Sequence, residues 1–304
     1  MNKKLSVISA LTIILAFMVY IIYDAASGSD REPASETSRD TMYSDNWKIS
    51  GTVSVGEGIL SSVAVSDNGT ICLAGDSFIK AVDHGHKELW STGTEQKITA
   101  LAVSGDTIFA STEETILVVS KNGKILNEWG PYEGNSIITS LSANHGMLAV
   151  ADAGSKRVFI LGPDGDVVSM LGQSGDHFII PSPYFDLAWS GNDLVVANPG
   201  RRRVETWSTD GRMISAFGEP GTAPGSFCGC CNPSHLAVTP YGIVTAEKGI
   251  NRVKILDREG HFIEFVSSHN SFDKSVPLDL AADSGKGIYA ADNANSKLYI
   301  FERK

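Results

Sequence analysis

Three of the four cysteines in the chain lie within four positions. They are Cys228, Cys230 and Cys231, in the segment SFCGCCNPSH, which covers residues 226–235 and ends in His235. Thiolates and imidazoles are ligands for copper(I) and zinc, and two neighbouring thiols can also form a disulfide or a redox-active pair. The chemistry of the segment therefore depends on the compartment that it faces and on its place in the fold.

The N-terminus predicts that compartment. Lys3 and Lys4 precede an uncharged run, Leu5–Tyr23, which can cross a bilayer as a helix because about 20 residues suffice. The lysines are expected on the cytoplasmic side, which places the rest of the chain outside. We expect residues 1–26 to be an uncleaved signal anchor, with a cleaved signal peptide as the alternative, and residues 27–46 to be a flexible polar spacer.

The composition indicates a globular protein and argues against one class of partner. The chain has 304 residues, of which 42% are hydrophobic and 20% charged, as in globular proteins. Its net charge of -10 argues against nucleic acid as a partner, because phosphates require a basic face.

The single N-terminal anchor predicts a protein of the inner or cytoplasmic membrane, with its folded part on the periplasmic or extracellular side.

A repeat of about 40–50 residues organises residues 47–304. Each copy has four strand patterns separated by turns, and the glycine of the last turn supplies the positive φ of a tight hairpin. This glycine recurs at Gly85, Gly123, Gly165, Gly211 and Gly260, and the six copies begin with the apolar segments 62–66, 100–104, 140–144, 186–190, 235–239 and 279–283. Four antiparallel strands per copy predict an all-β, six-bladed β-propeller. The sixth copy ends after its third strand, so we expect the N-terminal strand 47–55 to close the ring.

Within the copies, an acidic or amide residue is followed five positions later by a basic one. The pairs are Asp152/Arg157, Asn198/Arg203, Glu247/Arg252 and Asp292/Lys297. On this pattern the copies resemble the NHL repeat of six-bladed propellers, and FCGCCNP resembles a segment of exported bacterial NHL-repeat proteins. The resemblance implies the propeller but no single activity, because NHL-like propellers include protein-binding scaffolds, RNA binders and lyases.

These pairs have two interpretations. A carboxylate at the end of a second strand can accept N–H groups of its own loop and pair with the base on the third strand, which we favour. Alternatively, Asp152, Glu247 and Asp292 gather at the channel and hold calcium or another hard cation, as carboxylates do in gluconolactonase-like propellers.

Three long connections are expected on one face of the propeller. Residues 173–184 carry His177, residues 226–233 carry the cysteines, and residues 267–277 carry His269. A copper or zinc ion held by these groups is one hypothesis, and a structural disulfide or a redox pair are the others. The metal ligands would be Cys228, Cys230, Cys231, His235, His177 and His269. Further ligand-binding residues expected on this face are Arg201, Arg202, Glu247 and Lys248. We expect Cys72, in the first copy, to be a buried small hydrophobe.

The sequence thus predicts a membrane-anchored binding module whose cysteine-bearing face takes a metal, a small ligand or a membrane-bound or exported protein. One alternative is a metal-dependent lyase or hydrolase resembling peptidylglycine amidating lyase. In that interpretation His177, His235 and His269 hold the metal, Arg201 or Arg202 binds an anion and Tyr184 is the base. The other alternative is a pure protein-interaction scaffold with a structural disulfide.

Overall fold

The computed structural model describes residues 12–19, 46–56, 58–173, 177–229, 231–268, 272, 277–284 and 287–304. The chain divides into two units, Met1–Tyr43 and Ser44–Lys304. In the first unit, residues 12–19 form a short helix, and none of the described helices is long and apolar enough to span a bilayer. The rest of the predicted anchor and nearly all of the predicted spacer lie outside the described residues.

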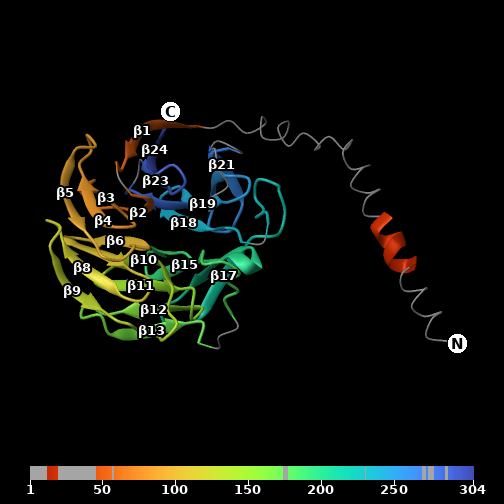
Figure 1. Cartoon of the computed structure of the whole chain (residues 1–304), viewed down its shortest axis with the longest axis horizontal. Coiled ribbons are helices and arrows are strands. Elements are labelled where there is room, and N and C mark those ends of the chain that lie inside the picture. Colours follow the sequence, from red (N-terminus) through yellow and green to blue (C-terminus); the bar gives the residue numbers. More distant parts are fainter. Residues whose placement is uncertain are drawn as a thin grey trace. The chain divides into compact units, whose positions relative to one another are not determined.

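The second unit consists of six four-stranded antiparallel sheets, each a blade of a β-propeller (Figure 1). The inner strands are β2 (Leu60–Val65), β6 (Ala100–Ser104), β10 (Ile138–Asn144), β14 (Leu187–Ser190), β18 (His235–Thr239) and β22 (Leu278–Ala282). The second strands are β3 (Ile71–Gly75), β7 (Thr107–Ser111), β11 (Met147–Asp152), β15 (Asp193–Asn198), β19 (Gly242–Glu247) and β23 (Gly287–Asp292). The third strands are β4 (Phe78–Val82), β8 (Ile116–Ser120), β12 (Arg157–Leu161), β16 (Arg203–Trp207), β20 (Arg252–Leu256) and β24 (Lys297–Arg303). The outer strands are β5 (Glu88–Gly93), β9 (Ile125–Trp129), β13 (Val167–Leu171), β17 (Met213–Phe217), β21 (Phe262–Ser267) and β1 (Trp47–Ser54). A short 3-10 helix, η2 (Pro199–Arg201), joins β15 to β16.

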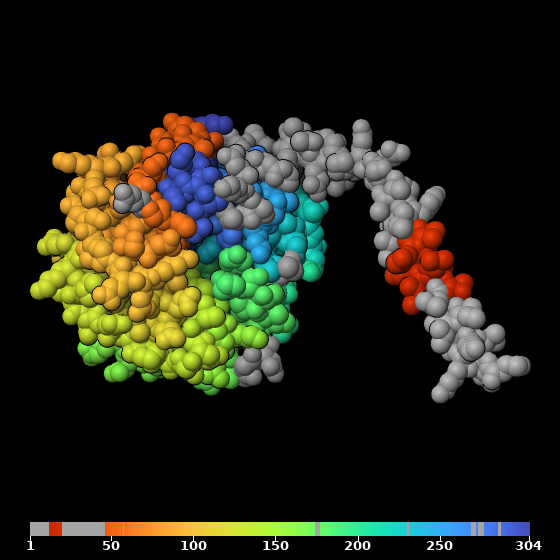
Figure 2. Space-filling model, viewed as in Figure 1, coloured from red at the N-terminus to blue at the C-terminus, as the bar shows by residue number. Residues whose placement is uncertain are grey.

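The inner strands contact one another in sequence order around the axis, and β22 contacts β2, so the ring is closed. Figure 2 shows the blades as adjacent sectors of the surface, coloured in the same order. Apolar side chains of neighbouring blades form the core between them; one cluster joins β19 and β20 to β22 and β23. The predicted six-bladed propeller is confirmed.

Strand β1 completes the sixth blade, as the sequence predicts. It pairs antiparallel with β24, with Trp47 opposite Arg303 and Ser54 opposite Lys297. The Trp47 ring is buried, and its indole N–H donates to Glu264 on the neighbouring strand β21 at 3.2 Å. The first strand of the propeller thus covers the edge that the last strand would otherwise expose.

In three of the five blades that carry it, the recurring glycine of the last turn has a second role that the sequence pattern does not reveal. At Gly165 a Cβ atom would lie 2.5 Å from the ring of Trp129, which belongs to the outer strand of the preceding blade. Trp90 covers Gly123 and Phe217 covers Gly260 in the same way. The positive φ of these glycines was expected, but Gly85 does not share it, because His86 adopts the left-handed conformation of that turn, at φ 64°.

Candidate functional site

One position of the repeat stands at the beginning of the inner-strand motif in all six blades. Its residues are Ser62, Ala100, Ser140, Asp186, His235 and Asp279, and all of them except His235 line a cavity along the central channel. Four of these side chains accept a hydrogen bond from the next blade. The donor in each case is the backbone N–H of the second residue of that blade's inner-strand motif. The bonds run to Asp279 Oδ2 from Val63 at 2.8 Å, to Ser62 Oγ from Leu101 at 3.1 Å, to Ser140 Oγ from Leu187 at 3.3 Å and to Asp186 Oδ2 from Leu236 at 2.6 Å. The position therefore links successive blades.

Asp186, His235 and Asp279 occupy this position in three consecutive blades and form a channel triad. His235 Nδ1 lies 3.6 Å from Asp186 Oδ2 and 3.4 Å from Asp279 Oδ1. Burial lowers the pKa of His235, but the two carboxylates outweigh it and raise this pKa to about 10. Among the described residues, this is the group of three His, Cys, Asp or Glu side chains whose ligand atoms all lie within 4.8 Å of one another.

The channel triad lies between two cavities. A cavity of about 360 Å³ opens at the mouth, and His235 and Asp279 form part of its wall together with Lys97, Glu113 and Tyr184. A cavity of about 480 Å³ follows the channel from the other side, and Asp186 and Asp279 line it. The ring of Tyr184 lies 6.4 Å from that of His235, and Lys248 Nζ lies 4.5 Å from the Tyr184 ring centroid.

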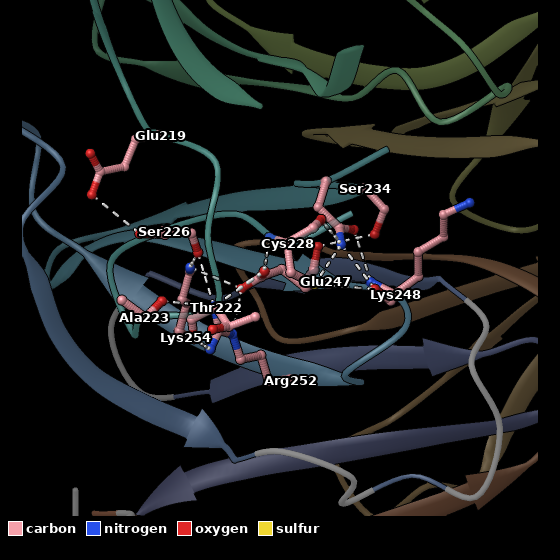
Figure 3. Close-up of polar contacts among 12 residues, drawn as sticks. Glu219, Thr222, Ala223, Ser226, Cys228, Ser234, Glu247, Lys248, Arg252 and Lys254 are labelled. Atoms are coloured by element: carbon pink, nitrogen blue, oxygen red, sulfur yellow. Dashed lines mark hydrogen bonds and ion pairs between the residues drawn. The ribbon is translucent and has the colours of Figure 1, made fainter. Parts of the chain in front are cut away.

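The cysteine-bearing connection is held by a buried charge cluster in blade 5 (Figure 3). The Glu247 carboxylate accepts Arg252 Nε at 2.6 Å, Lys254 Nζ at 2.9 Å and the Cys228 backbone N–H at 3.2 Å. Arg252 also donates to the backbone carbonyls of three residues of the connection, Thr222, Ala223 and Ser226. Burial lowers the pKa of Lys254 to about 8, although Glu247 acts in the opposite direction. Glu247 is thus an internal anchor of the loop and not a group that a ligand can reach.

The thiols themselves lie apart from the channel triad. Cys228 is half-buried beside the Asn232 amide, at 3.5 Å, and Cys231 is buried with its Sγ 3.3 Å from Ser182 Oγ. Burial, assisted by Glu247, raises the pKa of Cys228, which favours the thiol. No disulfide joins Cys72, Cys228 and Cys231 to one another, so the disulfide hypothesis is not supported for the pair Cys228 and Cys231. Cys230 lies outside the described residues, and with it a disulfide from Cys230 to Cys228 or to Cys231. Cys72 is buried, as expected.

The other predicted site residues are dispersed. His177 Nε2 lies 2.9 Å from Oε2 of the buried Glu205, which also accepts Arg203 Nε at 2.6 Å. Arg201 donates to the His177 carbonyl at 3.0 Å, and Arg202 donates to the Gly229 carbonyl at 2.6 Å. His269 lies outside the described residues. Of the six predicted metal ligands, His235 alone belongs to the channel triad.

The four acid–base pairs of the repeat are cross-strand neighbours in every blade that has one. Asp152 and Asp292 accept N–H groups of their own loops, as the favoured interpretation states. The predicted ion pair forms at Glu247/Arg252, whereas Arg157 pairs with Glu133 at 2.8 Å and Arg203 with Glu205. Asp152, Glu247 and Asp292 are buried within separate blades and bonded there, which argues against the carboxylate site proposed for them.

Comparison with known proteins supports the fold. Models of protein families and curated protein sequences give no match to the chain. Similar solved structures are the Pan2 WD40 domain of Neurospora crassa (TM-score 0.57, 10% identity, covering 84% of this chain and 95% of that one), the WD40 β-propeller domain of Doa1 (0.58, 14%, 82% and 80%) and the Cps50 (Swd1) β-propeller domain of Myceliophteria thermophila (0.57, 12%, 85% and 100%). At these identities the similarity establishes a propeller and nothing finer, and the NHL resemblance stays a prediction.

Proposed function

We propose that this protein is a membrane-tethered, extracytoplasmic binding module whose channel-mouth face binds an exported or membrane-bound protein. The observation that carries the proposal is the set of exposed side chains on this face. Ile59, Ile137 and Ile179 are 43%, 38% and 43% exposed, each beside the start of an inner strand or on the connection entering blade 4. Exposed apolar side chains near a concave polar site are typical of protein-interaction surfaces.

The polar part of the same face supports a protein ligand further. Lys97 and Glu113 are exposed at the mouth cavity, and Tyr184 offers an aromatic ring with Lys248 beside it. Aromatic rings with charged groups around them are the usual anchors of an interface. Buried Glu205 contacts His177 and buried Glu247 accepts the Cys228 N–H, so both connections are held at these residues, which lowers the cost of ordering them on binding.

Two matched isoleucines test the surface. Ile137 lies at the mouth and Ile125 on the outer strand β9, with 38% and 42% of their side chains exposed. We would express Ile137→Asp and Ile125→Asp full-length proteins in the native host and cross-link them to their neighbours. A partner captured by the wild type and by Ile125→Asp, but not by Ile137→Asp, supports the proposal. Equal capture by both variants contradicts it.

Membrane tethering rests on the uncharged run Leu5–Tyr23 behind Lys3 and Lys4. Fractionation tests it separately. The full chain should stay in the membrane pellet after an alkaline wash, whereas a chain starting at Ser27 behind a cleavable leader should be released. Recovery of the full-length, unprocessed chain in the soluble fraction would refute the tether and leave the binding surface untouched.

A further inference from the structure

We propose that Asp186, His235 and Asp279 bind a divalent cation of the zinc type at the inner end of the channel mouth. The first support is His235 Nδ1, which is buried and has no hydrogen-bond partner among the described residues. Its two carboxylate neighbours lie at 3.4 and 3.6 Å, beyond the range of about 2.7–3.2 Å of an N–H···O bond. The imidazole nitrogen thus lies at ion-pair distance from two carboxylates but within hydrogen-bond distance of neither, an arrangement that a bound cation would complete.

The two separations from His235 Nδ1 match those of a coordination sphere. Zinc binds histidine nitrogen and carboxylate oxygen at about 2.0–2.2 Å, and neighbouring ligands of a tetrahedron with such bonds are about 3.4 Å apart. His235 Nδ1 has this spacing to an oxygen of each aspartate. Three protein ligands leave one position open, which water or a ligand can reach because the triad borders a cavity on either side.

Further contacts hold the carboxylates in place. Asp279 Oδ2 accepts Ser62 Oγ–H and Val63 N–H, both at 2.8 Å, which leaves Oδ1 directed to His235. Asp186 accepts the N–H groups of Leu187 and Leu236. Such outer contacts orient the ligands of metal sites. Two carboxylates carry a charge of -2, which one imidazolium offsets by half and a divalent cation offsets completely.

The site differs in place and in chemistry from the one predicted at the cysteines. Its donors are oxygen and imidazole nitrogen, a set that suits zinc and related divalent ions and not copper(I). Metal binding at this site requires no protein partner, so it can be tested independently of the proposed binding surface.

Cobalt(II) is the probe for this site. The full-length protein, purified and stripped with a chelator, is titrated with Co²⁺ and followed by visible absorption. We expect one Co²⁺ per chain, a spectrum of low coordination number and no thiolate-to-metal band in the near ultraviolet. Asp279→Asn should weaken binding by at least about 100-fold, since even outer contacts are worth about 10–100-fold.

A second variant guards against a folding defect. In Asp279→Ser the hydroxyl can accept Val63 N–H as Ser62 accepts Leu101 N–H, so the link between blades survives while the channel oxygen is removed. Without metal, Asp279→Ser should unfold at a midpoint equal to or above that of Asp279→Asn. It should nevertheless fail to bind Co²⁺. The matched control is Cys228→Ser with Cys231→Ser, which should bind as the wild type does. Absence of Co²⁺ binding, a thiolate band, or binding that Asp279→Ser leaves unchanged overturns the proposal.

Discussion

The charge balance of the blade 5 anchor predicts that two neighbouring substitutions have very different costs. The side chains of Glu247 and Lys254 are fully buried and that of Arg252 is 2% exposed. One carboxylate thus faces two cations, a net charge of +1. Glu247→Gln raises this to +2 and removes the only counter-charge that the cluster contains among the described residues. Removing one partner of a buried ion pair costs about 3–5 kcal/mol, and we expect a cost in that range.

Lys254→Met should cost far less, although Lys254 is just as buried. It leaves Glu247 and Arg252 as a neutral pair, joined at 2.6 Å. The Ser226 carbonyl loses one donor but keeps Arg252, at 2.9 Å. The substitution also removes a cation–π contact, because Lys254 Nζ lies 4.3 Å from the Phe227 ring centroid, but a methionine sulfur near the same ring is favourable as well. We expect stability within about 1 kcal/mol of the wild type, or above it, as when a buried charge is replaced by an apolar group of similar volume.

Urea unfolding at pH 7, followed by tryptophan fluorescence, measures both variants. The control is Glu88→Gln, which breaks the Lys80–Glu88 pair, where Glu88 is 52% exposed; it should cost no more than about 1 kcal/mol. If Lys254→Met costs as much as Glu247→Gln, the cluster is stabilised by its individual hydrogen bonds and the charge-balance reasoning fails. A cost of Glu247→Gln as small as that of the control would refute it equally.

Three other predictions concern a turn glycine, the closing strand and the pKa of Lys254. Gly165→Ala should cost clearly more than the roughly 1 kcal/mol of Gly105→Ala, because both have positive φ but only at Gly165 does a neighbour, the Trp129 ring, meet the new Cβ; thermal unfolding compares them. Trp47→Ala should cost about 3–5 kcal/mol in urea, since the ring closing the sixth blade is buried, and a smaller loss would deny β1 this role. The pKa of Lys254 falls from 10.5 to about 8 on folding, so wild-type stability relative to Lys254→Met should rise between pH 8 and 10.5 and be constant below; a flat difference contradicts the shift.

The architecture was predictable because strand periodicity and turn residues are local, and the repeat multiplies a weak local pattern six times. The closing strand was predictable because a sheet edge must be covered and the sixth copy lacked a fourth strand. The stacking of Trp129 on Gly165 was not, because it joins residues of different blades. The positive φ of the turn already accounts for a glycine at this position, so the sequence pattern does not indicate that an aromatic ring also covers it.

The channel triad was within reach of the sequence but was not identified. Aligning the inner-strand motifs DLAWS, HLAVT and DLAAD places Asp186, His235 and Asp279 at one position. In a closed ring, residues at one position of consecutive blades converge on the axis, whatever their distance in the chain. The prediction took its donors from the three long connections expected on one face and from His235, so the aspartates at the matching position of blades 4 and 6 were not considered.

His177 was predicted to be a metal ligand and Glu247 a ligand-binding residue, although a local ion pair was favoured for Glu247 and Arg252, and the structure shows why the sequence leaves both roles open. A long connection on a rigid fold needs side chains that hold it, and these are charged or polar residues close to the connection, as ligand-binding residues are. His177 with Glu205, and Glu247 with Arg252, hold the connections that enter blades 4 and 5. What separates an anchor from a binding residue is burial: the Glu205 and Glu247 side chains are fully buried. Burial depends on the neighbouring strands and on the loop itself, so it becomes known only when the blade is assembled.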